Sequence, residues 1–255
     1  MLFAPFLFIY VLICLAFLAG LFILIQIDVI TYAYSVLGLS PRAAVLALLA
    51  SLVGSYINIP LYTVDSGPMQ APATVNNFGV LYSIPFQYAG SGTTTVAINV
   101  GGALVPLLIC AYALLRRPSA LLPSILGTAI VAWVAHQFAY PVRGLGIAIP
   151  LFIPPLTAAI VAILLGNAMR VRDSLHVIAY VSGVLGALIG ADLTNLNRIA
   201  DLGTPVASIG GAGTFDGVFL TGIVAVLLAG GPAGGRRAVP YEDREIPHRV
   251  HPREF

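Results

Sequence analysis

The chain has 255 residues, of which 59% are hydrophobic and only 9% are charged. Because soluble globular domains carry about 25% charged residues, this composition excludes a water-soluble protein. The formal net charge of +2 is too small to indicate nucleic-acid binding, and the complete absence of lysine excludes Schiff-base chemistry.

Apolar runs of about 20 residues, the length that a helix needs to cross a bilayer, recur along the chain. We therefore predict an all-α fold, a polytopic helical bundle that forms one transmembrane domain over residues 1–230. In chain order, the seven predicted spans are residues 2–27, 41–64, 95–115, 120–140, 146–169, 174–193 and 206–229.

Three segments connect or follow these spans. Residues 28–39 form a short amphipathic piece, and the polar loop 65–94 is predicted to be an external cap or a short hairpin. Residues 231–255 are rich in Pro, Arg and Glu, which is typical of a disordered tail outside the membrane. The fifth span contains Pro150, Pro154 and Pro155 and is predicted to be a proline-broken helix. Such breaks often form transporter binding sites, but simple kinks have the same pattern.

The arginines indicate the orientation of the bundle. In a seven-span topology, one side carries Arg42, Arg116, Arg117, Arg170, Arg172 and the five tail arginines. The other side carries Arg143 and Arg198. Since cytoplasmic loops are enriched in basic residues, the tail is predicted to be cytoplasmic and the N-terminus external, in the plasma membrane.

Two aspartates are the leading candidate catalytic residues. Asp216 lies inside the seventh predicted span, and Asp192 lies near the outer end of the sixth. Charge inside a span costs about 2.5–3.5 kcal/mol, so such residues usually have a function. Two carboxyls at similar depth on neighbouring helices can share a proton and activate a water, or they can bind a proton or Na⁺. A purely structural role as a helix cap stays open for both.

A glycine-rich segment precedes and surrounds Asp216. Gly210, Gly211, Gly213 and Gly217 let backbones approach closely and tolerate an unwound helix start, so they are candidate substrate-binding residues. Pro154 and Pro155 are candidates as well, because prolines free backbone carbonyls. Close helix packing is the alternative explanation for the glycines.

Four further polar residues are candidates for a supporting role: His136, Arg143, Asn195 and Arg198. His136 could relay protons, and either arginine could form a plain salt bridge with Asp192. The sequence has no metal-ligand spacing and implies no cofactor. The predicted partners are membrane lipid and a transmembrane peptide substrate, with the oligomeric state left open.

The segment from Gly213 to Thr221, which contains Phe215-Asp216-Gly217, resembles the Gly-x-Gly-Asp segment of presenilin and signal-peptide-peptidase proteases. The resemblance implies a catalytic pair of Asp216 and, on the preceding helix, Asp192. It covers about 30 residues, and two positions depart from the family pattern: Phe215 replaces a glycine, and Ala191 replaces a tyrosine.

Nearly the whole chain is similar to an uncharacterised bacterial and archaeal family of membrane proteins, of the domain of unknown function 1614 type. The residues that carry this similarity are 190–198, 207–217 and the prolines of the fifth span. It implies a topology and no activity. The resulting hypothesis is an intramembrane aspartyl protease-like enzyme, with a proton- or sodium-coupled transporter or channel and a non-catalytic scaffold as alternatives.

Overall fold

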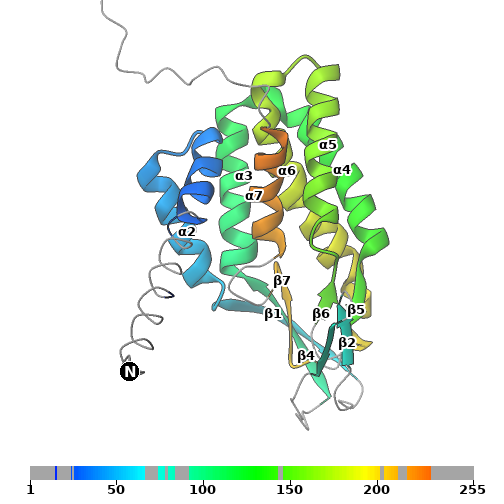
Figure 1. The fold of residues 1–255 in the computed structure, drawn as a ribbon. Coiled ribbons are helices and arrows are strands. Elements are labelled where there is room, and N and C mark those ends of the chain that lie inside the picture. The colour runs from blue at the N-terminus through cyan, green and yellow to red at the C-terminus, as the bar shows by residue number, and fades with distance from the viewer. Residues whose placement is uncertain are drawn as a thin grey trace, which may run out of the picture.

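The computed structural model describes residues 26–66, 74–77, 80–83, 92–142, 146–201, 204–211 and 217–230, together with Leu15 and Leu24. The tail 231–255 and almost all of the predicted first span lie outside the described residues. The described chain forms a helical bundle with a small sheet at one end (Figure 1). The prediction of a mostly helical fold is confirmed.

The α-helices that Figure 1 labels follow the helix Gln26–Val36 in the chain. They are α2 (Pro41–Gly54), α3 (Val105–Arg116), α4 (Leu121–Phe138), α5 (Ile153–Ala168), α6 (Leu175–Ala187) and α7 (Gly217–Ala229). Helix α6 packs against α3, α4, α5 and α7, and ten of its thirteen residues are buried. It is therefore the central helix of the bundle, and the side chains of the other helices cover it.

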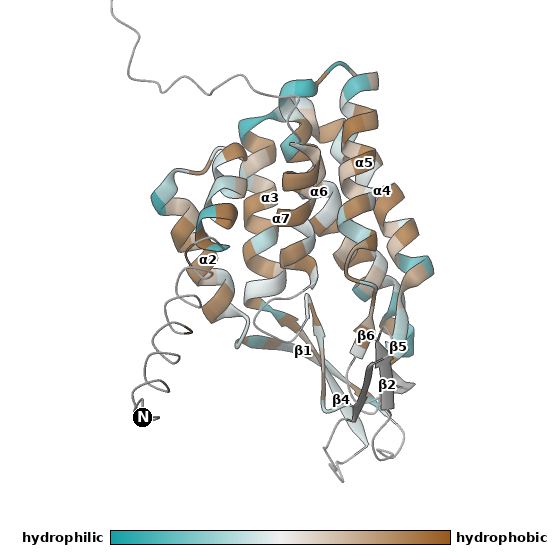
Figure 2. Ribbon diagram, in the orientation of Figure 1, coloured by the Kyte–Doolittle hydropathy of each residue, from teal (hydrophilic) through white to brown (hydrophobic). Residues whose placement is uncertain are grey.

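Two described helices are long and apolar enough to cross a membrane, Pro118–Phe138 and Arg172–Ile199. A third span results if the bent pair Gln26–Val36 and Pro41–Gly54, with its 116° angle, counts as one. Figure 2 shows apolar residues along the helices and hydrophilic residues at their ends. Membrane association follows from these spans, whereas the full set of seven stays a prediction.

The sheet was not predicted. Strand β1 (Asn58–Asp65) pairs antiparallel with β4 (Thr93–Asn99), and β4 pairs parallel with β7 (Val206–Ile209). The strands occupy the end of the predicted second span and the starts of the third and seventh, so an all-α fold is wrong in this detail. Their Thr, Val and Ile residues favour strands, and long-range pairing completes the backbone hydrogen bonds.

Two hairpins complete the sheet end. Strand β2 (Thr74–Asn77) pairs with β3 (Val80–Ser83) inside the polar loop 65–94, which confirms the hairpin prediction. Strand β5 (Tyr140–Val142) pairs with β6 (Gly146–Ala148). The second hairpin connects α4 to α5, so it lies at the same end of the bundle as β1, β4 and β7 (Figure 1).

The prediction of a proline-broken helix in the fifth span is wrong. Pro150 precedes the helix, and Pro154 and Pro155 lie in the first turn of α5. The first N–H groups of a helix have no intrahelical acceptor, so proline removes no hydrogen bond there. By contrast, a helix does begin at Pro41, the first residue of the predicted second span, and the Ser40 hydroxyl is its N-cap, accepting from the Ala43 N–H.

Candidate functional site

Asp192 lies where the central helix changes its geometry. The α-helical hydrogen bonding of α6 ends at Ala187, and the wider π-helical turn η4 (Leu188–Asp192) follows. A 3₁₀ segment, η5 (Leu193–Asp201), continues the chain toward the sheet. Single π-helical turns are rare and occur frequently at functional sites. Here the turn places Asp192 at the sheet end of the bundle.

Two contacts hold this turn. Asn195, which is fully buried, donates from Nδ2 to the Ala191 carbonyl at 2.9 Å and closes the helix end. Gly190 lies so close to α4 that a Cβ there would be 2.2 Å from the Ala132 carbonyl oxygen. Asn195 therefore caps the end of the helix, and Gly190 allows α4 to pack closely against it.

One oxygen of the Asp192 carboxylate has a defined partner. Oδ2 accepts a hydrogen bond from the Gly210 N–H at 2.7 Å, across 18 residues of sequence. In the part of the chain that the structure describes, Asp192 forms no ion pair: Arg198 is exposed on η5 and does not reach it. The salt bridge that the sequence allowed with Arg198 is therefore not formed, and Arg143 lies outside the described residues.

Gly210 is required at its position for two reasons. It has φ +86°, and an added Cβ would lie 2.7 Å from the Ala103 Cβ. Its neighbour Gly211 has φ +80°, so the chain turns sharply after β7. This turn presents the Gly210 N–H to Asp192, which means that the glycine run serves the aspartate directly.

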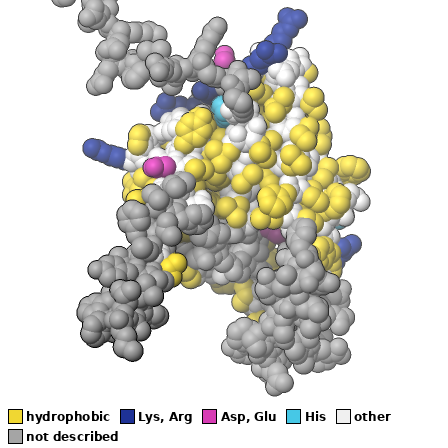
Figure 3. Space-filling view, viewed as in Figure 1, with side chains coloured by type: hydrophobic (Ala, Val, Ile, Leu, Met, Phe, Trp, Pro, Cys, Tyr) yellow, Lys and Arg dark blue, Asp and Glu magenta, His cyan; other side chains and the backbone are white. Residues whose placement is uncertain are grey.

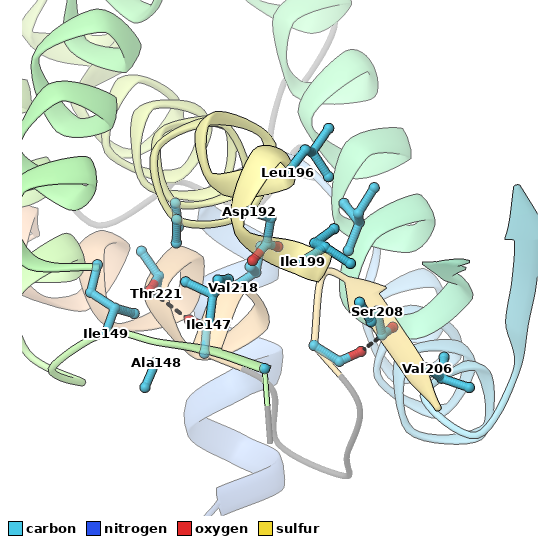
Figure 4. Close-up of a pocket in the computed structure, with 17 residues that line it drawn as sticks. Ile147, Ala148, Ile149, Asp192, Leu196, Ile199, Val206, Ser208, Val218 and Thr221 are labelled. Atoms are coloured by element: carbon cyan, nitrogen blue, oxygen red, sulfur yellow. Dashed lines mark hydrogen bonds between the residues drawn. The ribbon is translucent and has the colours of Figure 1, made fainter. Parts of the chain in front are cut away.

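A cavity of about 330 Å³ opens beside Asp192 (Figure 4). Its wall combines strand β6, strand β7, the η4–η5 segment and the first turns of α7. The lining residues are Gly146–Ile149, Ala187, Ala191, Asp192, Leu196, Ile199, Val206–Ile209, Gly211, Gly217, Val218 and Thr221. Asp192 is the acidic side chain among them, in an otherwise mostly apolar wall.

Asp216 and Gly213 lie outside the described residues. The residues that flank their segment on either side, Gly211 and Gly217, both line the cavity. The other candidates lie elsewhere: Pro154 and Pro155 are buried in α5 and do not line the cavity. His136 Nδ1 is 2.8 Å from the Thr194 hydroxyl, so it contacts the aspartate's segment but not the aspartate.

A polar network, buried at Asn99 and exposed at Asn58, holds strand β7 beside the cavity. Asn99, 1% exposed, donates from Nδ2 to the Ser55 carbonyl at 2.8 Å and to Asn58 Oδ1 at 3.1 Å. Asn58 Oδ1 also accepts from the Ser208 hydroxyl at 2.6 Å. Asn58 and Asn99 therefore connect strands β1 and β4, and Ser208 joins strand β7 to them.

Sequence reasoning missed Ser208 and Thr221 as lining residues. Thr221 is buried on α7 and donates to the Gly217 carbonyl. Both are ordinary small residues in apolar runs, and no local pattern distinguishes them. Their place in the wall depends on strand pairing and helix packing between distant segments.

A family model described as "Protein of unknown function (DUF1614)" matches residues 52–228. The chain belongs to the DUF1614 family. The matched region of this DUF1614 chain runs from α2 to α7 and includes Asp192, Gly210 and Asp216. No curated protein and no solved structure matches the chain.

Replacement of Gly210 by alanine should destabilise this DUF1614 protein by more than the cost of a left-handed residue, which is about 1–2 kcal/mol. The methyl group would also collide with Ala103 and displace the N–H from Asp192. Thermal unfolding of the purified protein in detergent measures the loss. Gly38→Ala is the matched control, because Gly38 has φ +95° with nothing within 4 Å of its Cβ position. Equal losses in the two variants would contradict the packing argument.

Proposed function

We propose that this DUF1614 protein is an intramembrane aspartyl protease-like enzyme that hydrolyses peptide bonds with Asp192 and Asp216. The observation that carries the proposal is the place of Asp192: its carboxylate lies in the wall of a cavity that Gly211 and Gly217 also line. Asp216 directly precedes Gly217 in the sequence.

The Asp192 carboxylate is available for chemistry. One oxygen accepts the Gly210 N–H, which orients the group, and the other has no hydrogen bond from a described residue. A carboxylate with no basic partner in an apolar wall is costly, and such a residue is usually retained for a function. An ion pair with Arg198 would have favoured a structural role.

The two carboxyls would divide the proton transfers of hydrolysis between them. The ionised carboxyl takes a proton from a water, and the resulting hydroxide adds to the carbonyl carbon of the peptide. The protonated carboxyl donates its proton to the carbonyl oxygen. When the C–N bond breaks, a proton passes to the leaving nitrogen, and the products are a carboxylic acid and an amine.

Strand β7 supports a peptide as the substrate. It is the edge strand of the sheet order β1-β4-β7, and its four residues line the cavity beside Asp192. An open strand edge can pair with the backbone of an extended peptide. Strand β6, which pairs with β5, lines the same cavity. A substrate backbone could therefore be held in extended form next to the aspartate.

Purified protein in liposomes should cut a transmembrane peptide, and Asp216→Asn should abolish the cutting. Mass spectrometry of the products measures it. Asp173→Asn is the matched control. Asp173 is exposed on the short helix before α6, whereas Asp192 lies beyond the other end of α6. Undiminished cleavage by Asp216→Asn would contradict the proposal.

Coupled transport of a proton or Na⁺ is the second candidate, because Asp192 has no basic partner among the described residues. The same liposomes separate the two. Ion-dependent flux without cleavage, lost on Asp192→Asn, would favour transport.

We also propose that the end of the bundle with Arg116, Arg117, Arg170 and Arg172 faces the cytoplasm of a plasma membrane. The cavity would then face outward.

A further inference from the structure

Basic residues gather at the end of the bundle opposite the cavity. Arg117 follows α3, and Arg170 and Arg172 follow α5. The hydroxyls of Ser119 and Ser174 lie 3.1 Å apart, so the α3–α4 and α5–α6 connections meet. Two chain segments that are distant in sequence therefore bring three arginines to one end of the bundle.

No acidic side chain in the described part of the chain neutralises these guanidinium groups. Arg170 and Arg172 are exposed, Arg117 is partly exposed, and none forms an ion pair within the described ranges. Asp173 is the acidic residue next to them in sequence, and it is exposed without a basic partner in that part of the chain. This end of the bundle thus carries a positive charge that a bound anion could neutralise.

The backbone of Arg170 is in an unfavourable conformation. Its φ is +58°, and it is the only non-glycine residue with a positive φ among the described residues. It ends α5 with the hydrogen bond from the Val171 N–H to the Gly166 carbonyl at 2.9 Å. Glycine usually occupies this position, because a Cβ is disfavoured there. A strained residue at a site where glycine would serve indicates that its side chain has a function.

Apolar, exposed side chains extend up to these arginines. Leu121 and Leu122 on α4 are 50% and 57% exposed, and Leu164 on α5 is 63% exposed. Figure 3 shows that basic side chains lie at the margins of the hydrophobic surface. Lipid tails would cover that surface, which would place the headgroups level with the arginines.

We propose that Arg117, Arg170 and Arg172 bind the phosphate headgroup of an anionic phospholipid. Guanidinium groups form paired hydrogen bonds with phosphate oxygens, and three positive charges at one end of the bundle favour a lipid with a net negative charge. This site is separate from the cavity at Asp192, so it does not depend on the proposed protease activity.

Full-length protein in nanodiscs of phosphatidylcholine, with or without phosphatidylglycerol, tests the proposal. Anionic lipid should raise the Tm of the wild type, and native mass spectrometry should show retained phosphatidylglycerol. Affinity should fall about fivefold for each arginine changed to glutamine. Arg198→Gln, at the cavity end, should bind as the wild type does.

Arg170→Gly keeps the test valid if the triple variant, in which Arg117, Arg170 and Arg172 are all changed to glutamine, does not fold. Glycine relieves the backbone strain, so this variant should unfold at a higher temperature in pure phosphatidylcholine. It should nevertheless lose part of its response to phosphatidylglycerol. Soluble inorganic phosphate should not replace the lipid. An unchanged lipid response in Arg170→Gly and the triple variant, or an equal loss in Arg198→Gln, would overturn the proposal.

Discussion

Asp192→Asn should fold like the wild type but lose cleavage by about a hundred- to ten-thousandfold, the usual contribution of a general acid or base. The amide oxygen of asparagine can still accept the Gly210 N–H at the 2.7 Å contact, so the β7 turn stays attached to η4. Asparagine cannot exchange a proton with water as a carboxyl does. The substitution therefore removes the chemistry and keeps the contact.

The same variant distinguishes a catalytic aspartate from a structural one. If Asp192 only caps the turn, asparagine should serve nearly as well, because both residues accept backbone hydrogen bonds. Turnover of a transmembrane peptide and the Tm in detergent should be measured on one preparation, with Asp173→Asn as the control. Wild-type turnover in Asp192→Asn would contradict the enzyme hypothesis and favour a scaffold.

Asn99→Ala should lower the free energy of unfolding by about 3 kcal/mol or more, because buried partners lose their hydrogen bonds. Asn99 Oδ1 accepts from the Gly102 N–H at 2.7 Å and caps the helical turn before α3. Its Nδ2 satisfies the Ser55 carbonyl and holds Asn58. Alanine leaves the buried Ser55 carbonyl and the buried Gly102 N–H without this partner, and the exposed Asn58 loses one of its contacts.

The Asn99 variant should also affect the candidate site. Asn58 would lose one of its partners and hold the Ser208 hydroxyl less firmly, so strand β7 should loosen beside the cavity. Thermal unfolding in detergent and hydrogen exchange of residues 206–209 measure the two effects. Asn167→Ala, on the exposed side of α5, is the control and should be neutral. A neutral Asn99→Ala would show that the network adds nothing.

Composition and the length of the apolar runs predicted the membrane-associated helical bundle. Spans of the right length, as in α4 and α6 with η4, follow from local hydrophobicity because lipid forces each backbone group to bond within its own helix. The same hydrophobic runs concealed the strands Thr93–Asn99 and Val206–Ile209, because both strands are short and directly precede apolar segments that were predicted as spans.

The candidate site was predictable in part. A charge in an apolar run identifies Asp192 as unusual whatever its surroundings, and the glycine run indicates a close approach. The partner of Asp192 was not predictable, because Gly210 and Asp192 meet only after β7 has paired with β4, more than 100 residues away in sequence. Likewise, no local pattern excludes Arg198 as its partner.

The sequence by itself determined that this protein is membrane-associated and mostly helical, and it identified Asp192 as the residue that most needs a functional explanation. It could do so because hydrophobicity and charge are properties of single residues and short segments. Only the tertiary structure decided that Asp192 has a backbone amide as its partner, that a cavity opens beside it, and that Pro154 and Pro155 begin a helix. These features depend on contacts between distant segments, and such contacts form only when the whole bundle packs.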